Sequence, residues 1–320
     1  MKKIYTAIIT SILSLQTLAI SAGNVADYAQ STTSGNSIVY INVYINAPRF
    51  VRPLIEKWIA EYKKVKPEAN FAIAKTQAAK NSSLLNILLS DVNPSEKTDK
   101  KTVFFGSYAI LPITSKDSEA AKSLENQELT TKKIKALYFE NEELDEQDKK
   151  NKFSDIVIYT GNDKESVSRE FAEFYGKDNT NFRGKRIVGD DLFLISAISK
   201  DPQGVSFNTL GNIYDLSSRK VKDNISILNI SYNKEEKAAL SEESNIDQLL
   251  DVLESNKASQ IPTEKIGFTY DDNDIEVTKF LVWILSTGEQ YNHQYGILRL
   301  DRKLLAQQAK YLPNLLAEQK

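Results

Sequence analysis

Residues 37–62 read SIVYINVYINAPRFVRPLIEKWIAEY, a stretch that predicts a strand, a short loop and an amphipathic helix. From Ile38 to Ile45, residues alternate with the period of two of a strand covered on both faces. After the loop, apolar residues recur at every fourth position: Phe50, Leu54, Trp58 and Tyr62. Pro53 is tolerated only in a first helical turn, so the helix should begin between Val51 and Pro53. Residues 46–50 would then lie over a helix N-terminus, where free N–H groups can bind an anion.

The overall composition narrows the classes of function. The 320 residues are 41% hydrophobic, enough for one large domain or two ordinary ones, and the formal net charge is −2. With so small a net charge, the protein lacks the positive electrostatic field that nucleic-acid binding requires. The chain has no cysteine, and His293 is its one histidine, so thiol catalysis and cysteine-based metal sites are excluded. We therefore expect no enzyme activity, no cofactor and no metal ion.

The first 23 residues have the pattern of a secretory signal peptide. Lys2 and Lys3 precede an uncharged, mostly apolar stretch that ends in small residues, Ser21-Ala22-Gly23. The alternative is an N-terminal membrane anchor, but the apolar part is short and interrupted by polar residues. No cysteine follows it, so we expect no bacterial lipoprotein anchor. We expect cleavage after residues 1–23, a flexible lead-in over 24–35 and a periplasmic location, since no later segment has about 18 apolar residues.

From there, strands and helices alternate, which predicts α/β architecture. The expected strands, besides the first, are 71–76, a strand pair or one bent strand over 102–114, 155–160, 204–207 and 225–230. The expected helices are 83–89, 131–139, 165–175, a helix opened by Asp190 and Asp191 as N-cap and ending at Ile198, 246–253, 276–285 and 302–312. Residues 140–152 read as a solvated, charged loop. The number of strands favours two α/β lobes over one compact sheet.

Four segments, taken in order, resemble the substrate-binding proteins of phosphate ABC transporters. They are INAPRFVRPLIEKW at 45–58, LLSDVNP at 88–94, FFGSYAILPIT with LTTKKIKALYF over 104–139, and FLVWILSTGEQYNHQYGILRL at 280–300. The segment GKRIVGDDLFLISAISKDPQGVSFNTLGNIYDL at 184–216 adds to the resemblance. No single motif decides it; the order and spacing of the segments carry it over most of the chain after residue 37.

The resemblance implies a two-lobed α/β fold of the type II periplasmic-binding-protein kind. In that fold two mixed sheets with flanking helices are joined by a two-strand hinge, and hinge closure traps the ligand between the lobes. Lobe one would comprise 36–105 plus 232–320, and lobe two 106–231. The implied partners are phosphate or a related small anion and an ABC permease, and we expect a monomer.

The resemblance also implies ligand-binding positions in both lobes. In lobe one, Arg49 falls on a family threonine ligand and Phe50 on the next position. Gln77 follows the second predicted strand, where the family has a serine, and Asp91 lies within LLSDVNP. In lobe two, the candidates on the loop and first turn of the helix are Asn162, Asp163, Lys164 and Ser166. Each has a structural alternative: Arg49 can be a solvated cation, Asp91 can close the Asn93-Pro94 turn, and Asp163 or Ser166 can cap the helix.

The chain departs from the family pattern at the anion contacts themselves. The family has an arginine followed by Ser-Gly-Thr before the lobe-two helix, whereas YTGNDKESVSREF here places Glu165-Ser166-Val167 near that motif. The first loop, Asn46-Ala47-Pro48, has no glycine, although close backbone approach to an anion usually needs one. Two functions therefore stay open: a substrate-binding protein for phosphate or a related oxyanion, and an exported interaction protein that keeps the fold without the ligand.

Overall fold

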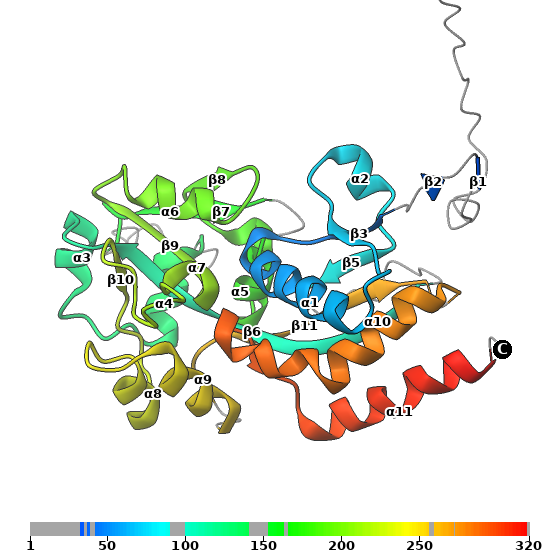
Figure 1. Cartoon of the computed structure of the whole chain (residues 1–320). Coiled ribbons are helices and arrows are strands. Elements are labelled where there is room, and N and C mark those ends of the chain that lie inside the picture. Colours follow the sequence, from blue (N-terminus) through cyan, green and yellow to red (C-terminus); the bar gives the residue numbers. More distant parts are fainter. Residues whose placement is uncertain are drawn as a thin grey trace, which may run out of the picture. The chain divides into compact units, whose positions relative to one another are not determined.

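The computed structural model describes residues 33–34, 37–38, 42–89, 100–140, 153–162, 166–255, 259–271 and 273–318 (Figure 1). The chain divides into two compact units, Met1–Ile41 and Asn42–Lys320. In the first, the described residues form the antiparallel pair β1 (Thr33–Ser34) and β2 (Ser37–Ile38). The predicted signal peptide and nearly all of the charged loop lie outside the described residues.

The second unit contains a ten-stranded mixed sheet. Its main order is β4-β3-β5-β11-β6-β9-β7-β8, and β10 and β12 each pair with β6. The strands are β3 (Val43–Asn46), β4 (Phe71–Ile73), β5 (Leu85–Leu88), β6 (Lys101–Ser115), β7 (Val157–Gly161), β8 (Lys185–Ile187), β9 (Gly204–Thr209), β10 (Ile225–Ile227), β11 (Thr263–Tyr270) and β12 (Leu298–Arg299). β3 is parallel to β4 and β5, and β7 is parallel to β8 and β9, whereas β6 and β11 run antiparallel to their neighbours.

The long strand β6 joins two groups of strands. Residues 101–109 pair with β11, which continues to β5, β3 and β4, while residues 110–114 pair with β9 and 113–115 with β10. In Figure 1, β6 runs from one group of elements into the other. Of the two predicted alternatives for 102–114, the single strand is therefore confirmed.

Helices flank both groups of strands. They are α1 (Arg52–Val65), α2 (Gln77–Asn81), α3 (Glu119–Leu124), α4 (Thr131–Tyr138), α5 (Ser168–Phe174), α6 (Leu192–Ile198), α7 (Leu210–Ile213), α8 (Lys234–Ala239), α9 (Ile246–Ser255), α10 (Ile275–Ser286) and α11 (Arg302–Glu318). The 3-10 segments are η2 (Arg49–Val51), η3 (Asn179–Asn181), η4 (Gly288–Tyr291) and η5 (His293–Tyr295). Pro53 lies in the first turn of α1, as predicted. Within the described residues, no helix has both the length and the apolar character that crossing a membrane requires.

Two predicted elements near the N-terminus are corrected. Residues 83–89 were expected to be helical, but Leu85–Leu88 form β5 between β3 and β11, with Leu85 fully buried. The helix comes earlier, as α2, which Thr76 caps by accepting a hydrogen bond from the Ala79 N–H at 3.2 Å. The first predicted strand is corrected at Asn42, which precedes β3 (Val43–Asn46), and residues 39–41 lie outside the described residues.

Aromatic side chains fill the core on both sides of β6. On one side, the buried Trp58 of α1 donates from Nε1 to the Gly288 carbonyl at 2.8 Å and packs edge-on against Phe105, with ring centroids 4.8 Å apart. On the other, Phe171 of α5 stacks on Phe207 of β9 at 4.1 Å. These contacts fix α1 and α5, the two helices whose N-terminal ends carry the site residues, against the sheet.

A candidate anion site at two helix starts

Arg49 joins the start of α1 to the loop before α6. It opens η2, which continues directly into α1. Its backbone N–H donates to Asp190 Oδ2 at 3.4 Å, and its Nε lies 3.8 Å from the same oxygen. The guanidinium carbon also lies 5.9 Å from the centroid of the Phe193 ring, within the range of a cation–π contact. With 52% of its side chain exposed, Arg49 is held loosely enough to meet a ligand.

The two aspartates before α6 point to different helices. Asp190 precedes the N-cap position of α6, which Asp191 occupies; Asp190 Oδ1 accepts from the Leu192 N–H at 2.9 Å, and its other oxygen faces Arg49. Asp191 does not cap α6 through its side chain. It is buried, and its Oδ2 accepts from the Val167 N–H, immediately before α5, at 3.0 Å. Carboxylates of the protein therefore occupy N–H groups at the starts of both α1 and α5.

A pair of serines lies at the start of α5. The helix begins at Ser168, so Ser166 and Val167 immediately precede it. The two hydroxyl oxygens lie 2.9 Å apart, Ser168 Oγ accepts from the Gly161 N–H at 2.9 Å, and both side chains are buried. In this conformation the hydroxyls bond to one another and to the backbone.

The surroundings of this turn are acidic. Burial raises the pKa of Asp191 to about 6, although the hydrogen bond from Val167 lowers it. Burial also raises the pKa of Glu170, whose carboxylate pairs with Arg169 at 2.6 Å. Desolvation favours the neutral form of a carboxyl group, and each carboxylate disfavours ionisation of the other. An anion that binds at α5 would therefore meet two carboxyl groups.

The structure places the other predicted ligand residues as follows. Phe50 is only 6% exposed and its ring packs on Tyr108 at 5.6 Å, so its side chain belongs to the core and is not free to contact a ligand. Gln77 lies on α2 and donates to Asn81 Oδ1 at 2.8 Å. Asn162 is exposed after β7, with its backbone N–H bonded to the Ile187 carbonyl at 3.3 Å. The remaining three, Asp91, Asp163 and Lys164, lie outside the described residues.

Comparisons with known proteins identify the fold. No family model matches the chain, and no curated protein sequence matches it significantly. Solved structures do match. A candidate phosphate ABC transporter substrate-binding protein with bound phosphate, from Clostridium perfringens, is 16% identical with a TM-score of 0.57, covering 82% of this chain and all of that one. An ABC-type phosphate transport receptor from Vibrio cholerae is 13% identical with a TM-score of 0.51, covering 81% of this chain and all of that one.

The fold is of the periplasmic-binding-protein type. The predicted fold class, a two-lobed type II architecture, is thereby confirmed. Both matched structures are of binding proteins, and at 16% and 13% identity they establish the fold alone. The lobe boundaries at residues 105/106 and 231/232 and the ligand positions stay predictions. Asp191 was not among the predicted ligand residues; the Asp-Asp pair after Gly189 was the available signal.

Proposed function

We propose that this chain is the exported substrate-binding protein of an ABC-type transport system, and that it binds phosphate or a related small oxyanion between its lobes without catalysing a reaction. The observation that carries the proposal is the position of Arg49. A half-exposed guanidinium just before a 14-residue helix faces the opposite group of strands, where it contacts Asp190 at 3.8 Å and the ring of Phe193. Guanidinium geometry suits bidentate binding of phosphate or carboxylate.

The proposal predicts a ligand-dependent stability that needs Arg49. Phosphate at a hundredfold excess over its Kd should add about 2.7 kcal/mol to the free energy of unfolding. Arg49→Ala should remove this gain, because the cation that faces the anion is lost. Thermal melting with and without phosphate, alongside titration calorimetry, measures both. Arg302→Ala, which removes an exposed arginine at the start of α11, is the matched control and should keep the full shift. Equal phosphate shifts in the wild type and Arg49→Ala would exclude Arg49 from the site.

The two aspartates favour a second function, in which the protein keeps the fold for interaction with a partner and does not bind phosphate. Asp190 accepts the Arg49 N–H and Asp191 accepts the Val167 N–H, so both helix starts already have an internal anionic partner. Phosphate would have to displace at least Asp190. If the protein binds phosphate, the anion displaces Asp190 from Arg49. If it does not, Asp190 stays paired with Arg49 in place of a ligand.

Removing the charge of Asp190 distinguishes the two functions. If phosphate competes with Asp190 for Arg49, Asp190→Asn should lower the Kd for phosphate about fivefold, close to the ~1 kcal/mol upper range for an exposed ion pair. The variant keeps a side-chain oxygen that can accept the Leu192 N–H, so α6 should stay capped. Calorimetry with phosphate and sulfate gives the result. Absence of heat with both ions, in the wild type and in the variant, would decide for the second function.

A further inference from the structure

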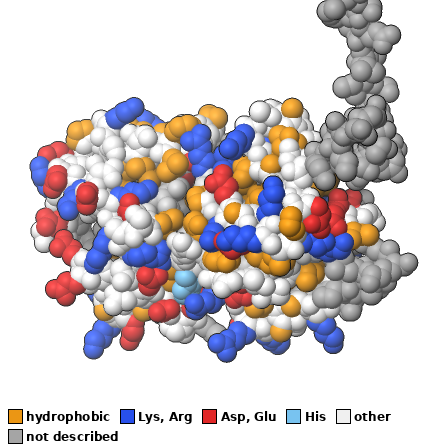
Figure 2. All heavy atoms as spheres, viewed as in Figure 1, with side chains coloured by type: hydrophobic (Ala, Val, Ile, Leu, Met, Phe, Trp, Pro, Cys, Tyr) orange, Lys and Arg blue, Asp and Glu red, His pale blue; other side chains and the backbone are white. Residues whose placement is uncertain are grey.

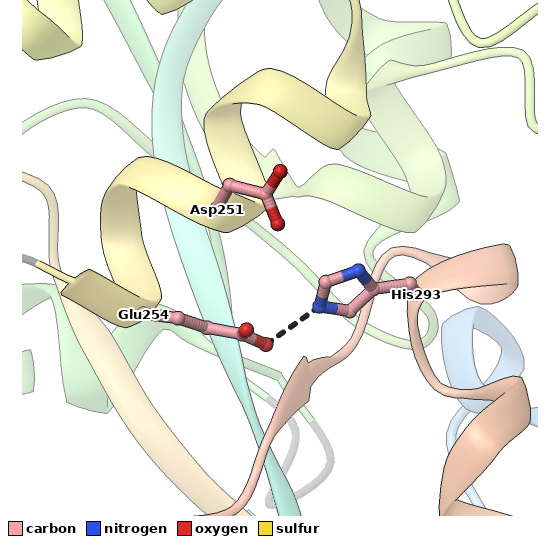
Figure 3. Close-up of side chains that lie close together, drawn as sticks. All are labelled: Asp251, Glu254 and His293. Carbon is pink, nitrogen blue, oxygen red and sulfur yellow. Dashed lines mark hydrogen bonds and ion pairs between the residues drawn. The ribbon is translucent and has the colours of Figure 1, made fainter.

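The single histidine of the chain lies beside two carboxylates, on elements other than those of the candidate anion site. His293 opens η5, while Asp251 and Glu254 lie about one turn apart on α9. One ligand atom from each residue lies within 4.8 Å of the other two. Figure 3 shows the three side chains converging from these two segments, with Glu254 pointing at the imidazole ring. In Figure 2 the histidine, in pale blue, reaches the surface of the visible face, where basic and acidic side chains are interspersed.

Neighbouring groups hold two of the three residues in place. His293 Nε2 lies 2.6 Å from Glu254 Oε1, and the same oxygen accepts the Arg299 N–H at 2.6 Å. The His293 carbonyl accepts from Arg219 Nη2 at 2.8 Å, and Arg219 also binds Asp247, one turn before Asp251 on α9. Only 15% of the His293 side chain and 20% of the Glu254 side chain are exposed. The imidazole and one carboxylate are therefore preorganised.

Asp251 takes part in none of these contacts. Its carboxylate has no hydrogen bond or ion pair with any other described residue. It nevertheless lies within 4.8 Å of a second carboxylate, whose own partners are the imidazole of His293 and the guanidinium of Arg299. Two carboxylates so close repel one another, and a cation bound between them would offset the repulsion. The unpaired Asp251 completes the set of donors that such a cation needs.

We propose that Asp251, Glu254 and His293 bind a divalent first-row transition-metal ion, with zinc as the representative. The donor set is one imidazole nitrogen and two carboxylate oxygens, which suits zinc better than calcium or magnesium, because those two ions prefer oxygen alone. Zinc lies about 2.0–2.2 Å from such ligands. Binding therefore needs His293 and Glu254 to separate slightly and Asp251 to approach. Three protein ligands leave one position for water. The bound ion would tie α9 to η5, independently of the anion proposed at Arg49.

The single histidine allows a direct test of this proposal. Because the chain contains one histidine and no cysteine, protein purified without a histidine tag has a single imidazole. Titration with zinc chloride should shift the ring C–H resonances of that imidazole in an NMR spectrum and give one site by calorimetry. Asp251→Asn should weaken zinc binding at least tenfold without changing the melting temperature of the metal-free protein, since that side chain has no bond to another described residue. His293→Gln should weaken it at least a hundredfold.

A matched control separates this site from general attraction of zinc to acidic residues. Glu235→Gln removes an exposed carboxylate on α8 and should leave the Kd for zinc unchanged. Imidazole resonances that stay in place at millimolar zinc would overturn the proposal. So would an Asp251→Asn variant that binds zinc as tightly as the wild type, or zinc binding that survives His293→Gln. Zinc is titrated without phosphate and phosphate without zinc, so failure at one site is distinguishable from failure at the other.

Discussion

Phe171→Ala is expected to lower the free energy of unfolding by about 3–5 kcal/mol. Phe171 is fully buried on α5, stacked on Phe207 at 4.1 Å and tilted against Tyr138 at 4.9 Å. Truncation removes the whole ring from an aromatic cluster that connects α4, α5 and β9. A cavity remains because the surrounding rings are fixed by their own neighbours, so the loss exceeds the transfer free energy of the ring alone.

The same helix offers the control. Phe174 also lies on α5, but 40% of it is exposed, so Phe174→Ala should change stability by about 0.5 kcal/mol or less. Urea denaturation of both variants measures the difference, provided that the dependence of the unfolding free energy on urea stays equal. If Phe171→Ala lost under 1 kcal/mol, the described packing of α5 would be incorrect. The start of α5 carries Ser166 and Ser168, and their placement would then be in question as well.

Sequence patterns predicted most of the elements because local periodicity decides them. The position of Pro53, with apolar residues at every fourth place after it, located the start of α1. Leu85–Leu88 was misassigned because LNIL is a short apolar run, which fits a helix as well as a strand. Its state follows from pairing with β3 and β11, and β11 lies about 180 residues away in the sequence.

The candidate site was predictable only in part, for the same reason. The resemblance drew attention to Arg49 and Ser166, and both lie at helix starts in the structure. The Asp190-Asp191 pair was visible in the sequence, but only as an N-cap. The contact of Asp190 with Arg49 joins residues 141 positions apart in the sequence, and the contact of Asp191 with Val167 joins residues 24 positions apart. Both contacts depend on the tertiary fold, which no local sequence pattern encodes. Side chains that replace a ligand also leave no sequence motif.

Asp191→Asn is expected to change how stability depends on pH. Burial raises the pKa of Asp191 to about 6, against an ordinary value of 3.8. The folded state therefore binds this proton more tightly than the unfolded state, so the contribution of Asp191 to stability falls as pH rises from about 4 to 6 and is constant above. A shift of about two pKa units corresponds to about 3 kcal/mol. Asparagine keeps an oxygen for the Val167 N–H and carries no charge, so the variant should lack this fall.

The informative quantity is the difference between Asp191→Asn and wild type in unfolding free energy, measured by urea denaturation at pH 4 and pH 7. It should move by about 2.4 kcal/mol in favour of the variant at the higher pH. Asp215→Asn is the control, and its difference from wild type should be nearly the same at pH 4 and pH 7, because hydrogen bonds from Ser217 and Ser218 lower the pKa of Asp215 to about 2. Its carboxylate stabilises the fold above about pH 4, and that stabilisation disappears as pH falls towards 2. Parallel curves for Asp191→Asn and wild type would mean that Asp191 is solvated in the folded protein. The start of α5 would then be open to an external anion.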